Sequence, residues 1–423
     1  MSDGAPVRGD VVIVGGGPVG LLLAVLLAQR GLEPVVVERR TRIATRPKAV
    51  GVHAPGWRVL EAAGVAERLE SSSVAITGGE VECDGRVLGR MRFPGDAAVR
   101  SVPQHLVEVA LEARLAELRP GALRRGAEAV AVVAPAGERA APAGVRVRLA
   151  DATELSADYA VLADGVRSRL RAELGIAWRL RRGSARYTMA DVTGPRAGGV
   201  AAGSEASARL CFERGGVVEA LPIPGGLRWV AHLGRPGRSR SGSAPHDWPD
   251  AAAFASLVEG RVGVRLAGDV EPSGFVARQR LATRFAAGRV ALVGDAAHEI
   301  SPIGGQGMSL GFRDAEELAG VLAAVSPAGG ASGAGADAAV GGGAGGTVGA
   351  GPAVGAGGPA PFGPYERHRR RAASRAIRRA AFNMAMGGPA RGIRLALRNL
   401  AVRVLALPPA RAALARVFTM RGL

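Results

Sequence analysis

The chain has 423 residues, 48% of them hydrophobic, which is enough for two domains with a large core. Its formal net charge of +18 is concentrated near the C-terminus, where residues 366–423 hold fourteen arginines and one acidic residue, Glu366. Aromatic residues make up 4% of the chain and do not alternate with the arginines, so the charge does not indicate nucleic-acid binding.

The first informative motif lies near the N-terminus. Residues 11–14 form an apolar, β-branched run, typical of a buried parallel strand. The next residues fit G-x-G-x-x-G, in which the glycines permit a tight turn, a close pyrophosphate and close helix packing. A helix over 21–29 is expected to present its N-terminal amides to the phosphates. The three glycines are Gly15, Gly17 and Gly20.

A second strand and an acidic residue complete a βαβ pattern. The apolar run 34–37 predicts a strand that ends at Glu38, whose carboxylate is at the right distance to bind a ribose hydroxyl. Arg39 and Arg40 follow directly and are instead compatible with a 2′-phosphate, hence NADP. The motif alone therefore predicts a dinucleotide without deciding which one.

The middle of the chain changes character twice. Helices and strands of mixed type are expected up to about residue 177, whereas 178–277 carries short alternating runs and many turns, which predict an inserted, mostly antiparallel sheet. The expected elements are helices over 57–69 and 104–118, short strands over 74–99 with turns at Gly78-Gly79 and Asp84-Gly85, and strands over 145–149, 159–162, 216–222 and 227–233.

The last quarter of the chain begins with a low-complexity segment. Residues 326–361 contain fourteen glycines and one charged residue, Asp337, so they cannot bury enough surface to offset their ordering entropy. We interpret them as a Gly/Ala-rich disordered linker. Helices are expected after it over 365–386 and 390–407, with a last one after Pro408 and Pro409.

A second glycine-rich motif precedes the linker. Residues 289–293 predict a strand ending at Gly294 and Asp295, followed by a proline- and glycine-rich loop over 301–307 and a helix from about Ser309. An aspartate at a strand end can hydrogen-bond a polyol such as the ribityl chain of a flavin. Amides of residues 304–308, at a helix N-terminus, can stabilise negative charge on a reduced ring.

Taken together, these segments resemble a known family. The set is GGGPVG, RPKAVGVHAPGWRVLEAAGV, VPQHLVEVALEARL, DYAVLADGVRSRLRAELGI and GRVALVGDAAHEISPIGGQGMSLGFRDAEEL. In this order, over about residues 8–325, it is similar to the single-component FAD-dependent aromatic hydroxylases of the p-hydroxybenzoate hydroxylase class. Only some 60 helical residues follow the linker, too few for the thioredoxin-like domain of larger members, so a short form is expected.

The resemblance implies an α/β fold, in which a Rossmann-like FAD-binding domain carries an inserted, mainly antiparallel β-sheet substrate domain and a helical C-terminal tail. The FAD-binding domain would comprise 1–73, 100–177 and 278–325. The substrate domain would comprise 74–99 and 178–277, followed by the linker at 326–361 and a basic helical region at 362–423.

The resemblance also assigns cofactor contacts. The first glycine motif would hold the FAD pyrophosphate, Glu38 the adenosine ribose and Asp295 the ribityl chain. Lys48 stands where the family usually has an arginine, so the charge is kept but the bidentate fork is lost. The implied cofactor-binding set is Gly15, Gly17, Gly20, Glu38, Arg39, Lys48, Gln104, Asp164, Gly165, Asp295, Pro302, Gly304, Gly305, Gly307 and Met308.

The implied activity is that of a monooxygenase. NADPH or NADH would reduce FAD, and oxygen would pass through a flavin C4a-hydroperoxide to an aromatic or polyketide-like substrate. The cofactor carries the chemistry, so no catalytic side chain is identified and no metal site is expected. Substrate contacts are expected from the inserted sheet, at Arg209, Phe212, Glu219, Leu221, Pro222 and Trp229.

Other activities use the same fold. A polyprenyl-type flavin reductase and a flavin-dependent halogenase are enzyme alternatives, although the four isolated tryptophans do not form the W-x-W-x-I-P segment usual in halogenases. A flavoprotein that binds FAD without catalysis is the non-enzyme alternative.

Several residues have a purely structural interpretation. Asp164 could cap a helix over 167–174, His298 is expected to order its loop, and Arg46 could be solvated or lie near a phosphate. In the C-terminal region, Arg391, Arg394 and Arg398 oppose Ile393, Leu397 and Leu400. This helix could rest weakly on an anionic membrane. We expect more strongly that its apolar side packs on the protein body.

Further properties bear on compartment and partners. Cys83 and Cys211 are far apart in the chain and predict no disulfide and a reducing, cytoplasmic location. No segment approaches the roughly 20 apolar residues of a membrane span. The expected partners are a small aromatic molecule and O2, with no nucleic acid, and the expected state is a monomer or homodimer.

Overall fold

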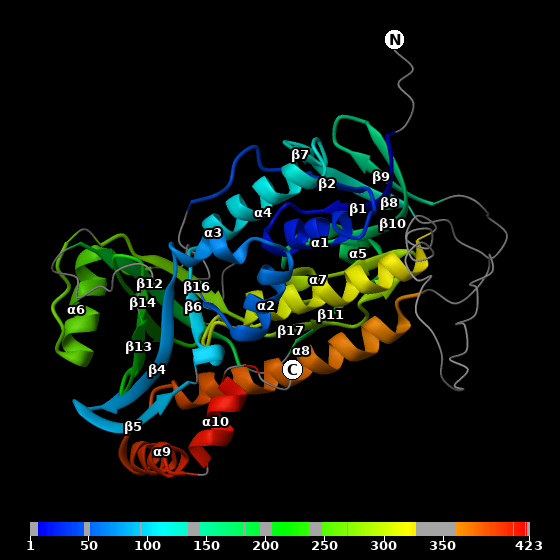
Figure 1. Ribbon diagram of the computed structural model, residues 1–423. Coiled ribbons are helices and arrows are strands. Elements are labelled where there is room, and N and C mark those ends of the chain that lie inside the picture. Colours follow the sequence, from blue (N-terminus) through cyan, green and yellow to red (C-terminus); the bar gives the residue numbers. More distant parts are fainter. Residues whose placement is uncertain are drawn as a thin grey trace, which may run out of the picture.

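The computed structural model describes most of the chain (Figure 1). Its described residues are 7–45, 51–93, 95–133, 144–180, 183–194, 205–236, 248–268, 270–326, 361–408, 410–418 and 420. Arg46, Lys48 and the predicted linker, apart from its two end residues, lie outside these ranges.

The first sheet is built around β1 (Val7–Val14), which pairs in parallel with β10 on one side and β2 on the other. Residues 11–14 are all buried, because helices cover both faces of a parallel sheet. The strand order is β18-β19-β10-β1-β2-β7, with β9 added to β10 and β8 to β9. These strands are β2 (Pro34–Glu38), β7 (Leu123–Arg125), β8 (Ala129–Val133), β9 (Val145–Leu149), β10 (Glu154–Leu162), β18 (Ala286–Ala287) and β19 (Val290–Leu292).

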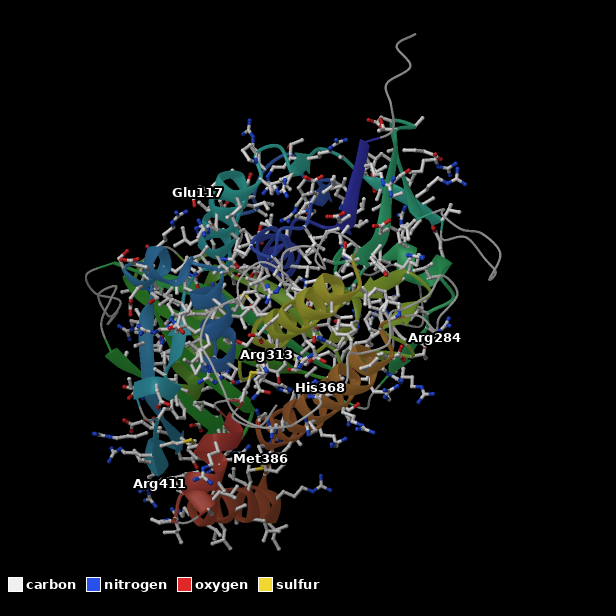
Figure 2. All side chains as sticks on the ribbon, turned by 45° about the vertical axis from the view of Figure 1, so that its right-hand side comes forward. Glu117, Arg284, Arg313, His368, Met386 and Arg411 are labelled. Carbon is white, nitrogen blue, oxygen red and sulfur yellow. The ribbon has the colours of Figure 1, made fainter. Side chains whose placement is uncertain are left out.

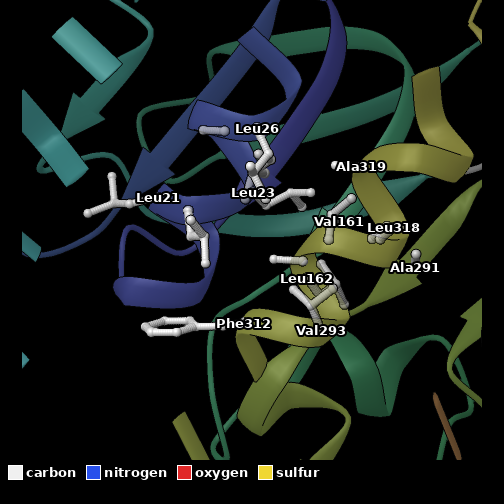
Figure 3. Close-up of a cluster of buried hydrophobic side chains, with 14 of the residues drawn as sticks. Leu21, Leu23, Leu26, Val161, Leu162, Ala291, Val293, Phe312, Leu318 and Ala319 are labelled. Carbon is white, nitrogen blue, oxygen red and sulfur yellow. The ribbon is translucent and has the colours of Figure 1, made fainter. Parts of the chain in front are cut away.

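Helix α1 (Pro18–Ala28) is the most deeply buried helix of this domain. Pro18 occupies its first turn, where a missing N–H costs nothing, and its residues 20–27 are all buried. Leu21, Leu23 and Leu26 belong to the same buried apolar cluster as Phe312 and Leu318 of α7 (Gln306–Val325) and residues at the ends of β10 and β19 (Figure 3). The remaining helices of the domain are α2 (Ala54–Ala62), α3 (Ala66–Glu70), α4 (Gln104–Leu118), α5 (Arg169–Glu173) and the 3₁₀ turn η2 (Gly294–Ala296). A second 3₁₀ turn, η1 (Gly95–Ala97), precedes a strand of the second sheet.

The second sheet combines strands from two separate parts of the sequence. Its order is β16-β12-β15-β14-β13-β4-β6-β3, with β5 added to β4, and only the β13–β4 pair is parallel among the described strands. Its strands are β3 (Gly51–Val52), β4 (Val74–Cys83), β5 (Arg86–Arg92), β6 (Val99–Ser101), β12 (Ala185–Thr193), β13 (Glu205–Glu213), β14 (Gly216–Ile223), β15 (Gly226–Gly234) and β16 (Ser273–Ala277). A small third sheet joins β11 (Trp178–Leu180), β17 (Arg280–Ala282) and β20 (His298–Glu299).

Several local expectations are wrong. The helix predicted over 57–69 is two helices, α2 and α3, because Gly64 adopts a left-handed φ of 74° between them. The Gly78-Gly79 turn is also wrong, since both glycines lie inside β4 opposite Arg92 and Met91. The Asp84-Gly85 turn is confirmed, with φ values of 48° and 69° that suit a tight hairpin.

A helix that the sequence reading missed lies within the second domain. It is α6 (Ala251–Val262), which covers the outer face of the second sheet (Figure 1). Its Phe254 and Val258 pack with Trp229 in a separate apolar cluster. Asp250 caps the helix by accepting a hydrogen bond from the amide of Ala253 at 2.8 Å.

The C-terminal region consists of three helices, α8 (Gly363–Met386), α9 (Gly392–Leu405) and α10 (Ala410–Phe418). Helix α8 packs along α7 and reaches the second sheet, whereas α9 and α10 lie against β5 (Figure 1). Among the described residues, no helix is both long and apolar enough to cross a bilayer.

A buried polar cluster joins α8 to the first domain. The Asp314 carboxylate lies 2.5 Å from His298 Nε2 and 2.6 Å from Arg369 Nε, and it also accepts a hydrogen bond from the amide of Gly294 at 3.1 Å. All three side chains are at most 1% exposed. Burial alone would raise the pKa of Asp314, but the facing His298 and Arg369 lower it below its usual value. The contacts of His298 agree with the loop-ordering role expected for it.

Removing this charge should be costly. We predict that Asp314→Asn lowers the free energy of unfolding by about 3 kcal/mol or more, because it leaves Arg369 buried without its counter-charge. Urea unfolding at neutral pH measures the effect. Glu317→Gln is the matched control, since Glu317 is 3.8 Å from the same arginine but partly exposed and should cost under about 1 kcal/mol. Equal effects of the two substitutions would contradict the role given to Asp314.

Candidate functional site

One cavity of about 1250 Å³ lies between the carboxyl ends of the first sheet and the inner face of the second sheet. Its lining includes the first glycine motif, the loop after β19, one face of the second sheet and parts of α8 to α10. The volume exceeds that of a typical pocket for one small molecule, so it can hold a dinucleotide and a substrate together.

The first glycine motif forms one end of the cavity. Gly15 has a φ of 113°, and its position would place a side chain 2.5 Å from the carbonyl oxygen of Ala163. A Cβ at Gly20 would lie 2.0 Å from the carbonyl oxygen of Gly15, which shows how closely α1 approaches β1. A Cβ at Gly17, by contrast, would have no heavy atom of the described, non-adjacent residues within 4 Å, so its backbone borders open space that a phosphate can enter.

Glu38 lies at the end of β2 and faces this space. Its carboxylate accepts hydrogen bonds from the amide of Gly16 at 2.8 Å and from Arg40 Nε at 2.9 Å. Burial would raise its pKa, but the contacts with Arg40 and Gly16 lower it. Arg40 is therefore engaged with Glu38, and both Arg39 and Arg40 line the cavity.

Asp164 and Gly165 lie beside the glycine motif. The Oδ1 atom of Asp164 is buried without a hydrogen-bond partner in the described part of the chain, and burial raises the pKa of this carboxyl to about 6. Gly165 has a φ of 82° and open space around it. The capping interpretation of Asp164 is wrong, because Ser168 caps α5 by accepting a hydrogen bond from the amide of Arg171. Both Asp164 and Gly165 thus face the cavity.

The loop after β19 forms the floor of the cavity. Asp295, Met308 and the loop residues Pro302, Gly304, Gly305 and Gly307 all line it. His53, which the sequence reading missed, holds this loop: its Nε2 lies 2.8 Å from the carbonyl oxygen of Gly304, and its amide donates to Ser309 Oγ at 2.9 Å. Burial lowers the pKa of His53 to about 4, so the ring is neutral at pH 7.

Most of the predicted cofactor positions are therefore gathered around one cavity. Gln104 also lines it, where its amide donates to Glu108 Oε1 at 2.8 Å. Gly20 lies behind the lining, and Lys48 is outside the described residues. The open backbone at Gly17 and Gly165, together with the unpartnered oxygen of Asp164, fits a bound FAD.

The second sheet contributes the opposite wall, and its two-residue period decides which side chains take part. Alternate residues of β13, β14 and β15 line the cavity, whereas their neighbours face away. The lining residues are Ala208, Leu210, Phe212, Val217, Glu219, Leu221, Arg228 and Val230, with Met189 and Phe275 from β12 and β16.

Half of the predicted substrate positions are thus on the wrong face. Phe212, Glu219 and Leu221 line the cavity, but Arg209, Pro222 and Trp229 do not. Arg209 instead pairs with Glu82 at 3.0 Å, and Trp229 packs under α6. The prediction combined residues from both faces of the sheet, as with Arg209 and Phe212 on β13. Counting alternate residues along each strand would have separated the two faces.

Glu219 is the most unusual residue of this wall. It is 4% exposed among apolar neighbours, and burial raises its pKa to about 7. No hydrogen bond from another described side chain reaches it in the structure. Arg228, on the next strand, is forked onto Asp191 at 2.5 and 2.7 Å and so is already neutralised. The carboxyl of Glu219 is therefore available to a ligand.

The C-terminal helices close the cavity and were not foreseen as part of it. Met386 at the end of α8 and Arg411 on α10 lie near one another in Figure 2, and both belong to the lining. Phe382, Asn383, Val402, Leu405 and Leu414 also contribute. No local pattern reveals these contacts, because they depend on where the chain returns after residues 327–360.

Comparisons with known proteins agree with this geometry. The family model described as "FAD binding domain" matches residues 8–339. The chain is 33% identical over 327 residues to the 3-(3-hydroxy-phenyl)propionate/3-hydroxycinnamic acid hydroxylase 2 of Burkholderia vietnamiensis, covering 75% of this chain and 57% of that protein. It is 31% identical over 320 residues to the rifampicin monooxygenase of Streptomyces venezuelae, covering 74% and 64%. The chain thus spans less than two-thirds of the length of these curated relatives.

Solved structures show the same fold. The p-nitrophenol 4-monooxygenase of Pseudomonas putida superposes with a TM-score of 0.76 at 21% identity, covering 98% of each chain. The anhydrotetracycline hydroxylase of Streptomyces rimosus gives a TM-score of 0.69 at 25% identity, covering 98% of this chain and 76% of that one.

The raised pKa of Glu219 predicts a specific pH dependence of stability. The folded protein holds this proton more tightly than the unfolded chain, so the contribution of Glu219 to stability falls as pH rises from about 4.5 to about 7. Glu219→Gln removes this loss. We expect the stability of the variant relative to the wild type to increase by on the order of 3 kcal/mol across that window. Urea unfolding at several pH values measures it, and parallel curves for the two proteins would refute the assignment.

Proposed function

Because the chain belongs to the family of single-component FAD-dependent aromatic hydroxylases, we propose that it is a monooxygenase that uses NAD(P)H and O2 to hydroxylate an aromatic or polyketide-like small molecule. One observation carries the proposal. A single cavity connects the dinucleotide cradle of the first sheet to a largely apolar wall of the second.

We propose the following contacts for FAD, which supplies two-electron transfer and oxygen activation when it is bound. Gly15, Gly17 and the N-terminus of α1 would hold the pyrophosphate, with Glu38 directed toward the adenosine ribose and Asp295 toward the ribityl chain. The backbone of residues 302–307 would lie along the isoalloxazine ring. The α7 N-terminal amides there would stabilise negative charge on the ring. Lys48 stays a predicted phosphate contact.

The other residues of the cavity would position the substrate and exclude water. Leu210, Phe212 and Val217 provide an apolar surface for an aromatic ring, and α8 to α10 shield it from solvent. Below about pH 7 the neutral carboxyl of Glu219 can donate a hydrogen bond to a substrate oxygen; above it, the carboxylate can accept one from a phenol. A hydroxylated polycyclic molecule satisfies both the largely apolar wall and the carboxyl of Glu219.

The test is to purify the protein, record its flavin spectrum and follow oxidation of NADPH and NADH with a panel of phenols and aromatic polyketides. We expect bound FAD, substrate-stimulated oxygen consumption and a product heavier by one oxygen atom. A protein that takes up no flavin after reconstitution would refute the proposal. Bound flavin without substrate-stimulated oxygen consumption would favour a reductase or a non-catalytic flavoprotein.

Helix α9 contradicts the expected packing of the C-terminal region. Its apolar stripe faces solvent: Ile393 is 77% exposed, and Leu397 and Leu400 are each 58% exposed. Arg398 points inward instead, where it donates hydrogen bonds to the carbonyl oxygens of Gly388 at 3.0 Å and of Phe212. The guanidinium group donates hydrogen bonds to these carbonyl oxygens. The apolar side chains on the other face of the helix have no donors and could not replace it.

We therefore propose that α9 rests on an anionic lipid surface. The exposed stripe continues through Val404 and Leu407, and Arg394 and Arg403 flank it on either side of the helix. An apolar stripe between two cations is the arrangement of an interfacial helix. A second copy of this chain is a poorer partner, because pairing two α9 helices would bring arginines together without acidic residues.

Vesicle binding tests this surface. We expect the protein to sediment with vesicles of 30% phosphatidylglycerol, and Leu397→Asn with Leu400→Asn to weaken binding more than 10-fold because buried apolar area is lost. Val109→Asn on α4 is the control, since Val109 is 50% exposed but far from α9 in the sequence and fold. Binding that is unchanged in the α9 variant, or an α9 variant that dissociates a dimer without affecting vesicle binding, would refute the proposal.

We also propose a reducing compartment such as the cytoplasm. Cys83 and Cys211 are both free thiols and both buried in the second domain. Burial raises the pKa of the Cys211 thiol to about 12, so it stays protonated and unreactive there.

A further inference from the structure

A second cavity of about 400 Å³ opens between α8 and the start of α7. Three arginines on consecutive turns of α8 line it, namely Arg375, Arg378 and Arg379, together with Asn383 on the next turn. Gln306, Phe382 and Leu414 complete the lining. Three cations therefore converge on a small space.

The charges of these arginines are not neutralised by the protein. Within the described residues, no ion pair involves any of the three, and both Arg375 Nε and Arg379 Nη1 are buried without a hydrogen-bond partner. Burial, together with the neighbouring Arg375 and Arg378, lowers the pKa of Arg379. Arg378 is exposed, but the buried guanidinium nitrogens of Arg375 and Arg379 lack a partner, and an anion in the cavity would offset that cost.

Other arginines of the same helix differ in this respect. Arg369 is paired with Asp314 at 2.6 Å, and Arg370 is paired with Glu366 at 3.4 Å. The sequence offers no other acid after Glu366, so the C-terminal helices cannot supply a counter-charge to the cluster themselves. Since no described acidic residue pairs with the cluster, a ligand or solvent ions can supply the counter-charge.

The cavity adjoins the loop on which the isoalloxazine ring would lie. A Cβ at Gly304 would be 3.3 Å from Asn383 Nδ2, and Gln306 is the first residue of α7. Gln306 is 3% exposed, and its Oε1 has no hydrogen-bond partner among the described residues. Phe382, Asn383 and Leu414 line both cavities, so a ligand can extend from one into the other.

We propose that this second cavity binds the phosphate groups of the nicotinamide dinucleotide that reduces the flavin. The inference rests on the proposed function, because it assumes that NAD(P)H is the reductant. In the proposed function FAD would take up the first glycine motif, so the reductant would need a separate anchor for its own phosphates. An anchor beside the flavin loop leaves the nicotinamide end free to reach the ring.

The charge of the cluster favours phosphates over a substrate carboxylate. A carboxylate carries one negative charge and would leave two arginines unpaired, whereas a pyrophosphate or a 2′-phosphate carries more charge and more acceptor oxygens. Arginine forks match phosphate oxygens in bidentate geometry. A carboxylated substrate is therefore the alternative source of the anion that an experiment must exclude.

Calorimetric titration of the FAD-loaded protein tests the site without turnover. The ligands are inorganic pyrophosphate, adenosine 2′,5′-bisphosphate and 3-phenylpropionate, used separately. We expect the two phosphate compounds to bind and the double variant Arg375→Gln with Arg379→Gln to bind them about 10- to 100-fold more weakly. Rapid-mixing measurements should show the same loss in the NADPH concentration needed for flavin reduction.

Arg371→Gln is the matched control. Arg371 lies one turn earlier on α8, is exposed and does not line the cavity, so removing its charge should change phosphate binding less than 2-fold. Flavin content and thermal midpoint establish that each variant is folded. Removal of repelling charges is not expected to lower the midpoint of the double variant.

Three results would overturn the proposal. Pyrophosphate that does not bind the wild type, or binds the double variant equally well, shows that the cavity is not a phosphate site. Binding of 3-phenylpropionate alone assigns it to the substrate. Phosphate binding that is lost while NADPH reduces the flavin normally separates the site from the reductant. None of these three affects the proposed monooxygenase activity, which fails instead if no substrate stimulates oxygen consumption.

Discussion

The ion pairs of Asp314 hold together three segments that the function requires. Its carboxylate contacts the amide of Gly294, the ring of His298 and the guanidinium of Arg369, which belong to the strand end that carries Asp295, to the loop after it and to α8. A buried carboxylate can ionise here because two partners offset its desolvation. The loop at the cavity floor and helix α8, which helps to close the cavity, are thereby both bound to the carboxylate of Asp314. This shared contact holds the loop and the helix at a fixed separation.

The two ends of the cavity differ in polarity. At the dinucleotide end, open backbone and the N-termini of α1 and α7 suit phosphates and a ring that becomes anionic. At the sheet end, apolar side chains surround one carboxyl, and the nearby arginine is already paired with Asp191. The cavity therefore has a polar end and a largely apolar end that adjoin each other.

The parts of the fold that follow from local rules were predictable. The strand before Gly15, the helix after it and the α/β fold class are confirmed. A buried parallel strand requires apolar, β-branched residues, and close packing of the helix on it requires glycine, so both features can be recognised in the sequence. The roles of the individual cofactor residues stay predictions. Errors arose where one residue determines the local structure. Gly64 ends a helix that was expected to continue, and Trp229 lies on the face of its strand that points away from the cavity. The orientation of α9 could not be read from its amphipathic pattern, since one carbonyl partner of Arg398, that of Phe212, lies 186 residues away in the sequence.

The parallel pairing of β4 with β13 has a consequence for how the molecule folds. It is the junction at which strands from residues 51–101 meet those from 185–277, with Ala75 opposite Glu205. The second sheet is therefore complete only after the intervening chain, including β7 to β10 of the first sheet, has brought these ends together. Closing such a long loop costs entropy before any contact across the junction repays it, and non-local pairing of this kind slows folding. We therefore expect the two sheets to unfold together, and a fragment cut between their segments would expose a long unpaired strand edge that is prone to aggregation.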